Sequence, residues 1–176
     1  HIDKYDPSKY DLKKCKLSLM DKWALSKLNT LVKTVDEGLA EYKTFETARC
    51  IQDYVDELSN WYVRRGRERY WGKEMTEDKA AAYTTLYTVL VTLSKVIAPY
   101  VPFMAESMYN NLVPAFFKDE PISVHLCSFP VCDESFVDAE LEKGMEDVLE
   151  IVALGRAARN GSNIKNRQPL KKLYIA

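Results

Sequence analysis

The sequence is poor in the residues from which most recognisable active sites are built. Only six of its 176 residues are glycine, and each stands apart from the others, so no Gly-rich loop is present to hold a nucleotide phosphate. Only two residues are histidine, and because His1 is terminal, His125 is the one imidazole left for a His-based triad. These shortages argue against catalysis by this chain alone.

Cysteine is equally scarce. None of the four cysteines has the paired Cys-x-x-Cys spacing of a zinc or redox motif. The nearest cluster, His125, Cys127 and Cys132, offers three ligands where structural zinc takes four. We therefore expect no metal site, and free thiols such as those of a cytoplasmic protein.

Long apolar runs and a secretory signal are also missing, so we expect neither a membrane span nor export. The sequence lacks an initiator methionine, which suggests a piece of a longer protein.

The net charge is only −1, but the charges are unevenly distributed. Residues 61–73 carry four arginines and a lysine against one acid, Glu68, and residues 155–172 carry six basic residues and no acid. The compensating acids gather between residues 133 and 150. Because local fields rather than net charge attract a polyanion, two basic segments remain candidates for binding one.

Hydrophobic spacing indicates helices throughout. Apolar residues recur at steps of three and four from Leu28 to Tyr42 and from Ala48 to Tyr62, which is helical spacing. Ser18 or Asp21 is a candidate cap for the first helix. The predicted helices cover about 18–42, 44–71, 76–98, 103–112 and 136–160, the last ending at Asn160-Gly161.

The spacing predicts an all-α fold, an antiparallel helical bundle with a short extended or β appendage near the C-terminus. Residues 170–175 resemble a strand, and Ile122, Val124 and Leu126 alternate like a short strand. We expect three regions: an irregular leader over 1–17, the bundle over 18–161, and a basic loop with a first strand over 162–176.

The most informative segment runs from Ser59 to Trp71 and sets four arginines among two tryptophans and two tyrosines. Arginine offers a fixed fork of donors to phosphates and base edges, and aromatic rings stack on exposed bases. This combination indicates a helix end that holds RNA.

If the helix continues unbroken to Trp71, Asn60, Arg64, Arg67 and Trp71 share the side opposite the apolar stripe. Arg65 and Arg69 fall on the stripe itself, which suggests that the last turns project beyond the core. The simpler interpretation is that these cations only complement the helix dipole and cover apolar surface.

We expect Arg64 and Arg67 to contact RNA backbone or base edges, and Trp71 or Trp61 to supply stacking surface. Arg65, Arg69 and Lys73 are expected to attract phosphates. Lys165 and Arg167 form a second basic patch in a loop. The candidate RNA-binding residues are Asn60, Trp61, Arg64, Arg65, Arg67, Arg69, Trp71, Lys73, Lys165 and Arg167.

Six blocks of the sequence resemble the isoleucyl-tRNA synthetase family, in that family's order. They are Leu25-Ser26-Lys27-Leu28-Asn29, the segment from Ser59 to Trp71, the segment from Ala98-Pro99 to Ala105-Glu106, Ser123-Val124-His125-Leu126, Gly155-Arg156-Ala157-Ala158-Arg159, and Arg167-Gln168-Pro169-Leu170. Their ordered set covers nearly all of residues 18–176.

The resemblance implies the helical anticodon-binding domain of a class I aminoacyl-tRNA synthetase, with the anticodon loop of isoleucine tRNA as its partner. The whole enzyme would join isoleucine to tRNA using ATP and magnesium. The catalytic signatures His-Ile-Gly-His and Lys-Met-Ser-Lys-Ser are absent here, so this chain is expected to bind no cofactor and to be inactive alone. A monomeric, cytoplasmic protein is implied.

Two alternatives remain open at this point. The tryptophans and arginines between Ser59 and Trp71 could instead be a protein-binding hot spot on a helical interaction module, because Trp, Tyr and Arg are enriched in such hot spots. The chain could also be a small helical enzyme that uses His125 and nearby acids.

Overall fold

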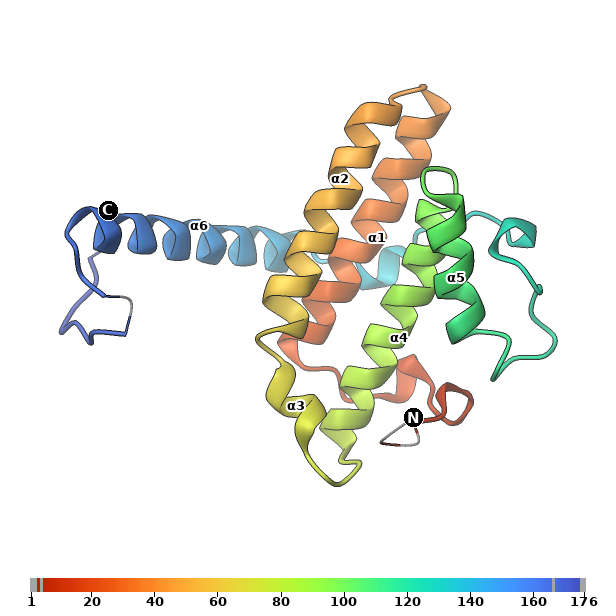
Figure 1. Cartoon of the computed structure of the whole chain (residues 1–176), viewed down its shortest axis with the longest axis horizontal. Coiled ribbons are helices and arrows are strands. Elements are labelled where there is room, and N and C mark those ends of the chain that lie inside the picture. Colours follow the sequence, from red (N-terminus) through yellow and green to blue (C-terminus); the bar gives the residue numbers. More distant parts are fainter. Residues whose placement is uncertain (1–2, 4, 166, 175–176) are drawn as a thin grey trace. The chain divides into compact units, whose positions relative to one another are not determined.

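The computed structural model describes residues 3, 5–165 and 167–174, and it is built from helices (Figure 1). The α-helices are α1 (Leu19–Ala40), α2 (Thr44–Glu57), α3 (Arg67–Trp71), α4 (Glu77–Ile97), α5 (Pro102–Leu112) and α6 (Ala139–Gly161). A π-helix, η3 (Leu58–Val63), follows α2 directly, and the 3-10 turns are η1 (Pro7–Lys9), η2 (Leu12–Lys14), η4 (Val124–Leu126) and η5 (Glu134–Phe136). The described residues contain no strand, which confirms the predicted all-α class.

The chain divides into two compact units, His1–Val137 and Asp138–Ala176. The predicted boundaries after residues 17 and 161 stay predictions.

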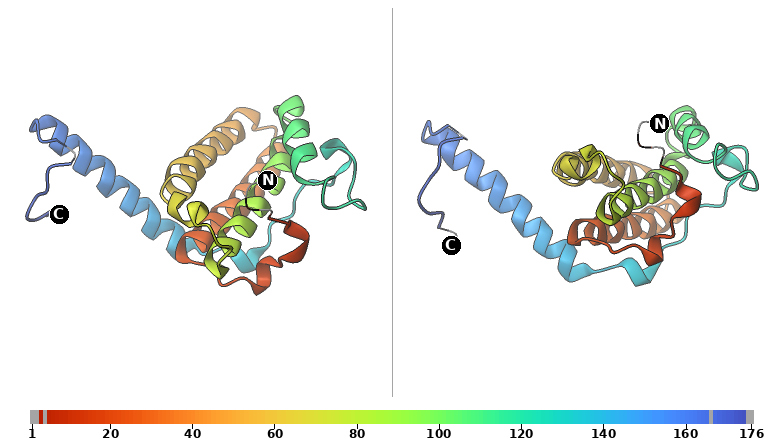
Figure 2. Two further views of the ribbon diagram at one scale, coloured as in Figure 1. Left: turned by 60° about the horizontal axis from the view of Figure 1, so that its bottom comes forward. Right: turned by 90° about the horizontal axis from the view of Figure 1, so that it is seen from below.

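The core of the first unit lies between α1, α2 and α4, with α5 against α4 (Figures 1 and 2). The short connection between α1 and α2 makes them antiparallel neighbours, as the sequence predicts. All four helices contribute buried side chains to this core, among them Trp23, Val35, Tyr54, Val89 and Tyr109. The predicted stripe of α1 is buried from Leu28 to Val35, but Tyr42 lies in the turn beyond it and is 89% exposed.

Side-chain caps fix where the long helices begin. Ser18 caps α1, with its Oγ accepting from the Asp21 backbone N–H and its own N–H donating to Asp21 Oδ2 at 2.8 Å. This reciprocal capping box satisfies two backbone donors and joins the two residues that the sequence offers as alternative caps. Thr76 caps α4 by accepting from the Lys79 N–H.

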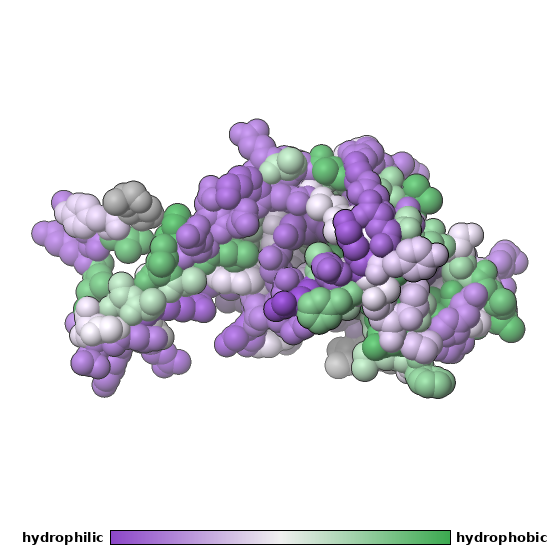
Figure 3. Space-filling view, turned by 90° about the horizontal axis from the view of Figure 1, so that it is seen from above, coloured by the Kyte–Doolittle hydropathy of each residue, from purple (hydrophilic) through white to green (hydrophobic). Residues whose placement is uncertain are grey.

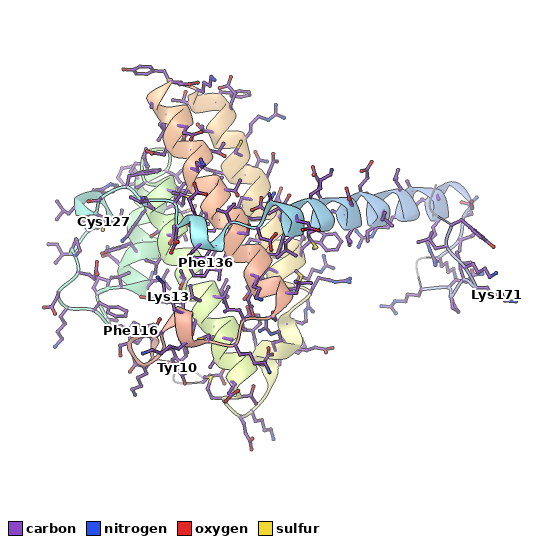
Figure 4. All side chains as sticks on the ribbon, turned by 180° about the vertical axis from the view of Figure 1, so that it is seen from behind. Tyr10, Lys13, Phe116, Cys127, Phe136 and Lys171 are labelled. Carbon is purple, nitrogen blue, oxygen red and sulfur yellow. The ribbon has the colours of Figure 1, made fainter. Side chains whose placement is uncertain are left out.

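The leader packs against α4. Tyr5 stacks between the rings of Tyr10 and Tyr83, at 5.3 Å and 5.2 Å between centroids, and its hydroxyl donates to Thr84. Figure 4 labels Tyr10 and Lys13 on this segment. The described residues before α1 contain the 3-10 turns η1 and η2, and aromatic contacts hold Tyr5 and Tyr10 against α4. The predicted irregular leader over 1–17 stays a prediction.

The two predicted extended segments are not strands. Residues 124–126 form the 3-10 turn η4, in which the Cys127 N–H donates to the Val124 carbonyl, so their side chains cannot alternate as in a strand. Residues 170–174 have no regular structure, and Ile175 lies outside the described residues. Helix α4 spans Glu77–Ile97, close to the predicted range of about 76–98. Among the described helices, only α4 is long and apolar enough to cross a membrane. However, 56% of its most apolar 18-residue stretch is buried inside the protein, as in a core helix.

At one end of the bundle the hydroxyl of Tyr100, in the α4–α5 turn, donates to Thr47 in the first turn of α2 at 2.6 Å. Figure 3 looks onto the bundle from the side of the α1–α2 turn, and hydrophobic residues lie scattered there among hydrophilic ones. In the sequence, Tyr42 and Phe45 lie at the α1–α2 turn and Phe103 and Met104 at the start of α5, and all four side chains are exposed.

The second unit consists of α6 and the residues that follow it. Helix α6 ends at Gly161, which confirms the predicted stop at Asn160-Gly161. The Arg159 guanidinium donates to the carbonyls of Lys165 and Gln168, at 3.1 Å and 2.8 Å, and folds the loop back toward the helix end. The side chains of the tail, Lys171 among them, are exposed (Figure 4).

Candidate nucleic-acid interface

The segment with the arginines and tryptophans is not one continuous α-helix. After Glu57 the backbone widens into η3, where the Arg64 N–H donates to Ser59 five residues back at 3.0 Å. At Gly66 the helix breaks, and α3 begins at Arg67. A Cβ at Gly66 would lie 2.7 Å from the Tyr62 carbonyl oxygen, so only glycine fits this turn without a backbone shift. The predicted unbroken helix to Trp71 is therefore wrong.

This break changes the face on which the last arginines lie. A regular helix, which advances about 100° per residue, would place Arg69 on the apolar stripe of α2 where it extends beyond the core. In the structure the Arg69 side chain instead points inward and is only 19% exposed. The Arg69 Nη1 and Nη2 atoms donate to the two Asp21 oxygens, each at 2.8 Å. Its Nε and Nη2 atoms donate to the two Asp78 oxygens, also at 2.8 Å. The expected exposed position of Arg69 is thus wrong.

Asp21 is the buried centre of this arrangement. Its side chain is fully buried and also accepts from the Tyr62 hydroxyl at 2.6 Å. Burial by itself raises the pKa of Asp21, but hydrogen bonds from Arg69, Tyr62 and Ser18 outweigh burial and lower the pKa below its usual value. The Asp21 carboxylate in turn raises the pKa of Arg69, so both groups are charged at neutral pH.

The other arginines of the segment face solvent. Arg64, Arg65 and Arg67 are exposed, and within the described part of the chain none of them forms an ion pair. The Arg65 guanidinium lies 5.6 Å from the centre of the Trp61 ring, and that of Arg67 lies 5.5 Å from the Trp71 ring. Each pair is a cation on an aromatic face, which orders the guanidinium without neutralising it.

The two tryptophans differ in exposure. Trp71 is 72% exposed, whereas Trp61 is half-buried. Asn60 and Lys73 are exposed at the two ends of the same segment. The structure therefore brings together, on η3, α3 and their connections, seven of the ten predicted contact residues with accessible side chains: Asn60, Trp61, Arg64, Arg65, Arg67, Trp71 and Lys73.

Lys165 and Arg167 belong to the second unit, and both are exposed. The Lys165 backbone carbonyl accepts a hydrogen bond from Arg159 at 3.1 Å. These two residues stay a separate predicted patch.

Sequence reasoning missed the residues that hold the segment in place. Asp21 appears there only as a cap, and Asp78 and Lys79 not at all. Lys79 is 1% exposed, and its Nζ donates to the Gly72 carbonyl at 2.6 Å, directly after Trp71. A lysine after a helix cap resembles any surface lysine, so no local signal in the sequence marks it.

His125 and Cys127 contact residues outside this segment. His125 Nε2 is 4.0 Å from Glu106 Oε2, and the Cys127 thiol, labelled in Figure 4, contacts the Ser123 carbonyl. All four cysteines are free thiols. Among the described residues no group of three or more His, Cys, Asp or Glu side chains is arranged to hold a metal ion.

Comparison with known proteins shows which family this chain belongs to. Residues 21–175 match the family described as the anticodon-binding domain of tRNA ligase. The chain is 57% identical over 176 residues to isoleucine–tRNA ligase of Clostridium novyi and 53% identical to that of Clostridium acetobutylicum. It is 46% identical to isoleucine–tRNA ligase 2 of Bacillus cereus. Each match covers 99% of this chain but only 16% to 17% of the relative.

Proposed function

Because this chain belongs to the family of anticodon-binding domains of tRNA ligases, we propose that it binds the anticodon stem-loop of isoleucine tRNA as one part of an isoleucine–tRNA ligase. The observation that carries this proposal is the pair of uncompensated cation–aromatic contacts, Arg65 on Trp61 and Arg67 on Trp71. They present positive charge and ring surface side by side, which is what an exposed single-stranded loop requires.

Each exposed residue has a role that its chemistry allows. Trp71 offers its free ring face to an unstacked base, and Arg67 beside it donates to a phosphate or to a base edge. Arg64 acts in the same way. Trp61 is half-buried, so we assign it to supporting Arg65 rather than to stacking on RNA.

The remaining exposed polar residues complete the surface. Arg65 and Lys73 attract phosphates, and the Asn60 amide provides one donor group and one acceptor for a base edge. Lys165 and Arg167 are proposed as a second contact to the same RNA. Arg69 is already paired with two carboxylates, and it is not part of the surface that we propose.

The ligase as a whole would attach isoleucine to tRNA with ATP and magnesium. This chain spans about 17% of the length of its relatives, and we assign both cofactors to the catalytic region outside it. We further propose that the ligase works as a monomer in the cytoplasm. The described residues favour neither a protein-binding module nor a catalytic role for His125.

The test is a titration of the chain with isoleucine tRNA across a salt series, beside the same tRNA with a swapped anticodon. Tight binding that weakens with salt and falls on the swap supports an anticodon reader. Equal binding to both tRNAs would reduce the site to a nonspecific basic surface.

A matched control is present in the same bundle. Arg49 lies 5.6 Å from the Phe45 ring near the α1–α2 turn, at the end of the bundle opposite α3 (Figure 1). Both are exposed, so they repeat the cation–aromatic chemistry of Arg67 and Trp71 at another place. We expect Arg67→Ala to weaken tRNA binding and Arg49→Ala to leave it unchanged. The opposite order would contradict the proposed surface.

A further inference from the structure

Arg69 differs from the other arginines of its segment because its guanidinium forms ion pairs with two carboxylates, Asp21 and Asp78. The Asp21 and Asp78 oxygens accept from its Nε, Nη1 and Nη2 atoms at 2.8 Å. Together the three side chains carry two formal negative charges and one positive charge. A phosphate that approached this cluster would meet a net negative field and would have to displace a bidentate pair.

We propose that Arg69 is a positioning residue that fixes the direction of α3, and thereby points Arg67 and Trp71 toward the RNA. This inference rests on the proposed function above and replaces the phosphate contact that the sequence predicts for Arg69.

Helix α3 needs such an anchor because little else holds it. It has five residues, no side-chain cap at its start, and no fully buried residue. A helix of this length is not stable by itself, so its contacts with the rest of the protein determine its direction. Those contacts include the Arg69 cluster, the edge-on packing of Tyr70 on Tyr83 at 5.4 Å, and the Lys79 bond to Gly72.

The cluster joins α3 to three other elements around the buried Asp21 carboxylate. Asp21 belongs to α1, Tyr62 to η3 and Asp78 to α4, and the first two meet through the Tyr62 hydroxyl at 2.6 Å. Asp21 is also held by Ser18 in the capping box. Because the carboxylate is fixed from several sides, the guanidinium that binds it is fixed as well.

Helical geometry links this anchor to the RNA surface. Arg67 precedes Arg69 by two residues and Trp71 follows it by two, so each projects about 200° away from Arg69 around the helix axis. Arg67 and Trp71 are four residues apart and therefore share one face, where their side chains meet at 5.5 Å. Turning Arg69 inward thus turns both of them outward.

The test compares Arg69→Gln with Arg67→Ala in tRNA titrations of this chain over a salt series. Removing one phosphate contact lowers the slope of log affinity against log salt by about 0.7 to 0.9. We expect Arg67→Ala to show a reduced slope. For Arg69→Gln we expect binding about tenfold weaker, and in a chain that already carries Arg67→Ala we expect it to leave the slope unchanged, because the only phosphate contact it disturbs is that of Arg67. A further reduction of the slope by Arg69→Gln in the Arg67→Ala chain would overturn the inference.

Asp78→Asn gives a second test. The Asp78 side chain is 57% exposed, so this substitution should disturb folding less than Arg69→Gln does. Removing a negative charge near a polyanion site should by itself strengthen binding. If Arg69 contacted phosphate, freeing it would strengthen binding further and steepen the salt dependence. We expect weaker binding instead, because α3 loses part of its anchor, and tighter binding would refute this.

A double-mutant cycle separates positioning from a general loss of stability. If Arg69 acts through Arg67 and Trp71, Arg69→Gln should have little further effect on affinity in a chain that already carries Arg67→Ala and Trp71→Ala. An undiminished effect in that background would contradict the inference. The 19F NMR signal of 5-fluorotryptophan at Trp71 should shift in Arg69→Gln while circular dichroism keeps the helix content, and an unmoved signal would also count against it.

The outcomes distinguish this inference from the proposed function. If Arg67→Ala and Trp71→Ala leave tRNA binding intact, the proposed surface itself fails. If they weaken it while Arg69→Gln and Asp78→Asn do not, only the positioning role fails.

Discussion

The Nζ atom of Lys79 donates a hydrogen bond of 2.6 Å to the carbonyl oxygen of Gly72, the residue directly after Trp71. The same ammonium pairs with Asp3 Oδ1 at 3.0 Å and lies over the Tyr83 ring. A lysine that is 1% exposed is tolerated only when its charge is paired in this way. The contact ties the end of α3 to α4 and to the leader.

Lys79→Met should lower the free energy of unfolding by about 1 to 3 kcal/mol, because the Gly72 carbonyl and the Asp3 carboxylate both lose a charged donor. Methionine retains most of the lysine stem, so the loss is mainly polar. Urea denaturation measures the change. Lys73→Met is the control, since Lys73 is exposed. Equal stability of the two variants would show that the buried contact contributes little.

Gly66→Ala should also destabilise the chain, by about 1 to 3 kcal/mol, because the new Cβ would lie 2.7 Å from a backbone oxygen that cannot move freely. Gly144→Ala in α6 is the matched control. No atom lies within 4 Å of a Cβ there, so alanine should stabilise that helix by up to about 1 kcal/mol. Thermal unfolding measures the stability of both variants. If Gly66→Ala left the stability unchanged, the turn at Gly66 would have to relax to accept the new Cβ.

The sequence predicts the helices well because their signals are local. Ser18 and Thr76 are caps at the first residues of apolar periodic segments, and the structure starts α1 and α4 directly after them. The stripe from Leu28 to Val35 is buried for the same reason. Spacing of three and four residues needs no knowledge of the rest of the chain.

The candidate site is predicted less well because two of its features are not local. The π-turn from Leu58 to Val63 shifts the helical register, and no residue pattern announces it. Arg69 is drawn inward by Asp21, which is 48 positions away in the sequence. A helical wheel that assumes regular geometry therefore places Trp71 on the accessible side correctly and Arg69 wrongly.

Trp71→Ala should separate binding from stability. The ring is 72% exposed, so its loss should change the free energy of unfolding by no more than about 0.5 kcal/mol. Affinity for an anticodon stem-loop should fall by about 1 to 3 kcal/mol if the ring stacks on one base. Fluorescence anisotropy with a labelled stem-loop measures this loss.

Trp61→Ala provides the contrast, because Trp61 is half-buried and supports Arg65. We expect it to lower both stability and affinity. If Trp61→Ala alone reduced affinity and Trp71→Ala did not, the stacking role would belong to Trp61.

Stability in acid should depend on Asp21. Its pKa is lowered in the folded protein, since hydrogen bonds from Arg69, Tyr62 and Ser18 outweigh the opposing effect of burial. The unfolded chain, with an Asp pKa of about 3.9, therefore binds a proton more readily than the folded one. The stabilisation is fully present above that value and is lost as the pH falls through the folded pKa.

We expect Asp21→Asn to cost about 3 to 5 kcal/mol at pH 7, because it leaves part of a buried ion pair without its partner. As the pH falls below about 4, wild-type Asp21 becomes protonated too, so the difference between the two proteins should shrink. Urea denaturation at intervals from pH 7 to pH 2 follows this difference. Asp36→Asn, at an exposed position of the same helix, is the control and should keep a small, constant difference from wild type. A gap between wild type and Asp21→Asn that stayed constant into acid would mean that the charge of Asp21 is not what stabilises the cluster.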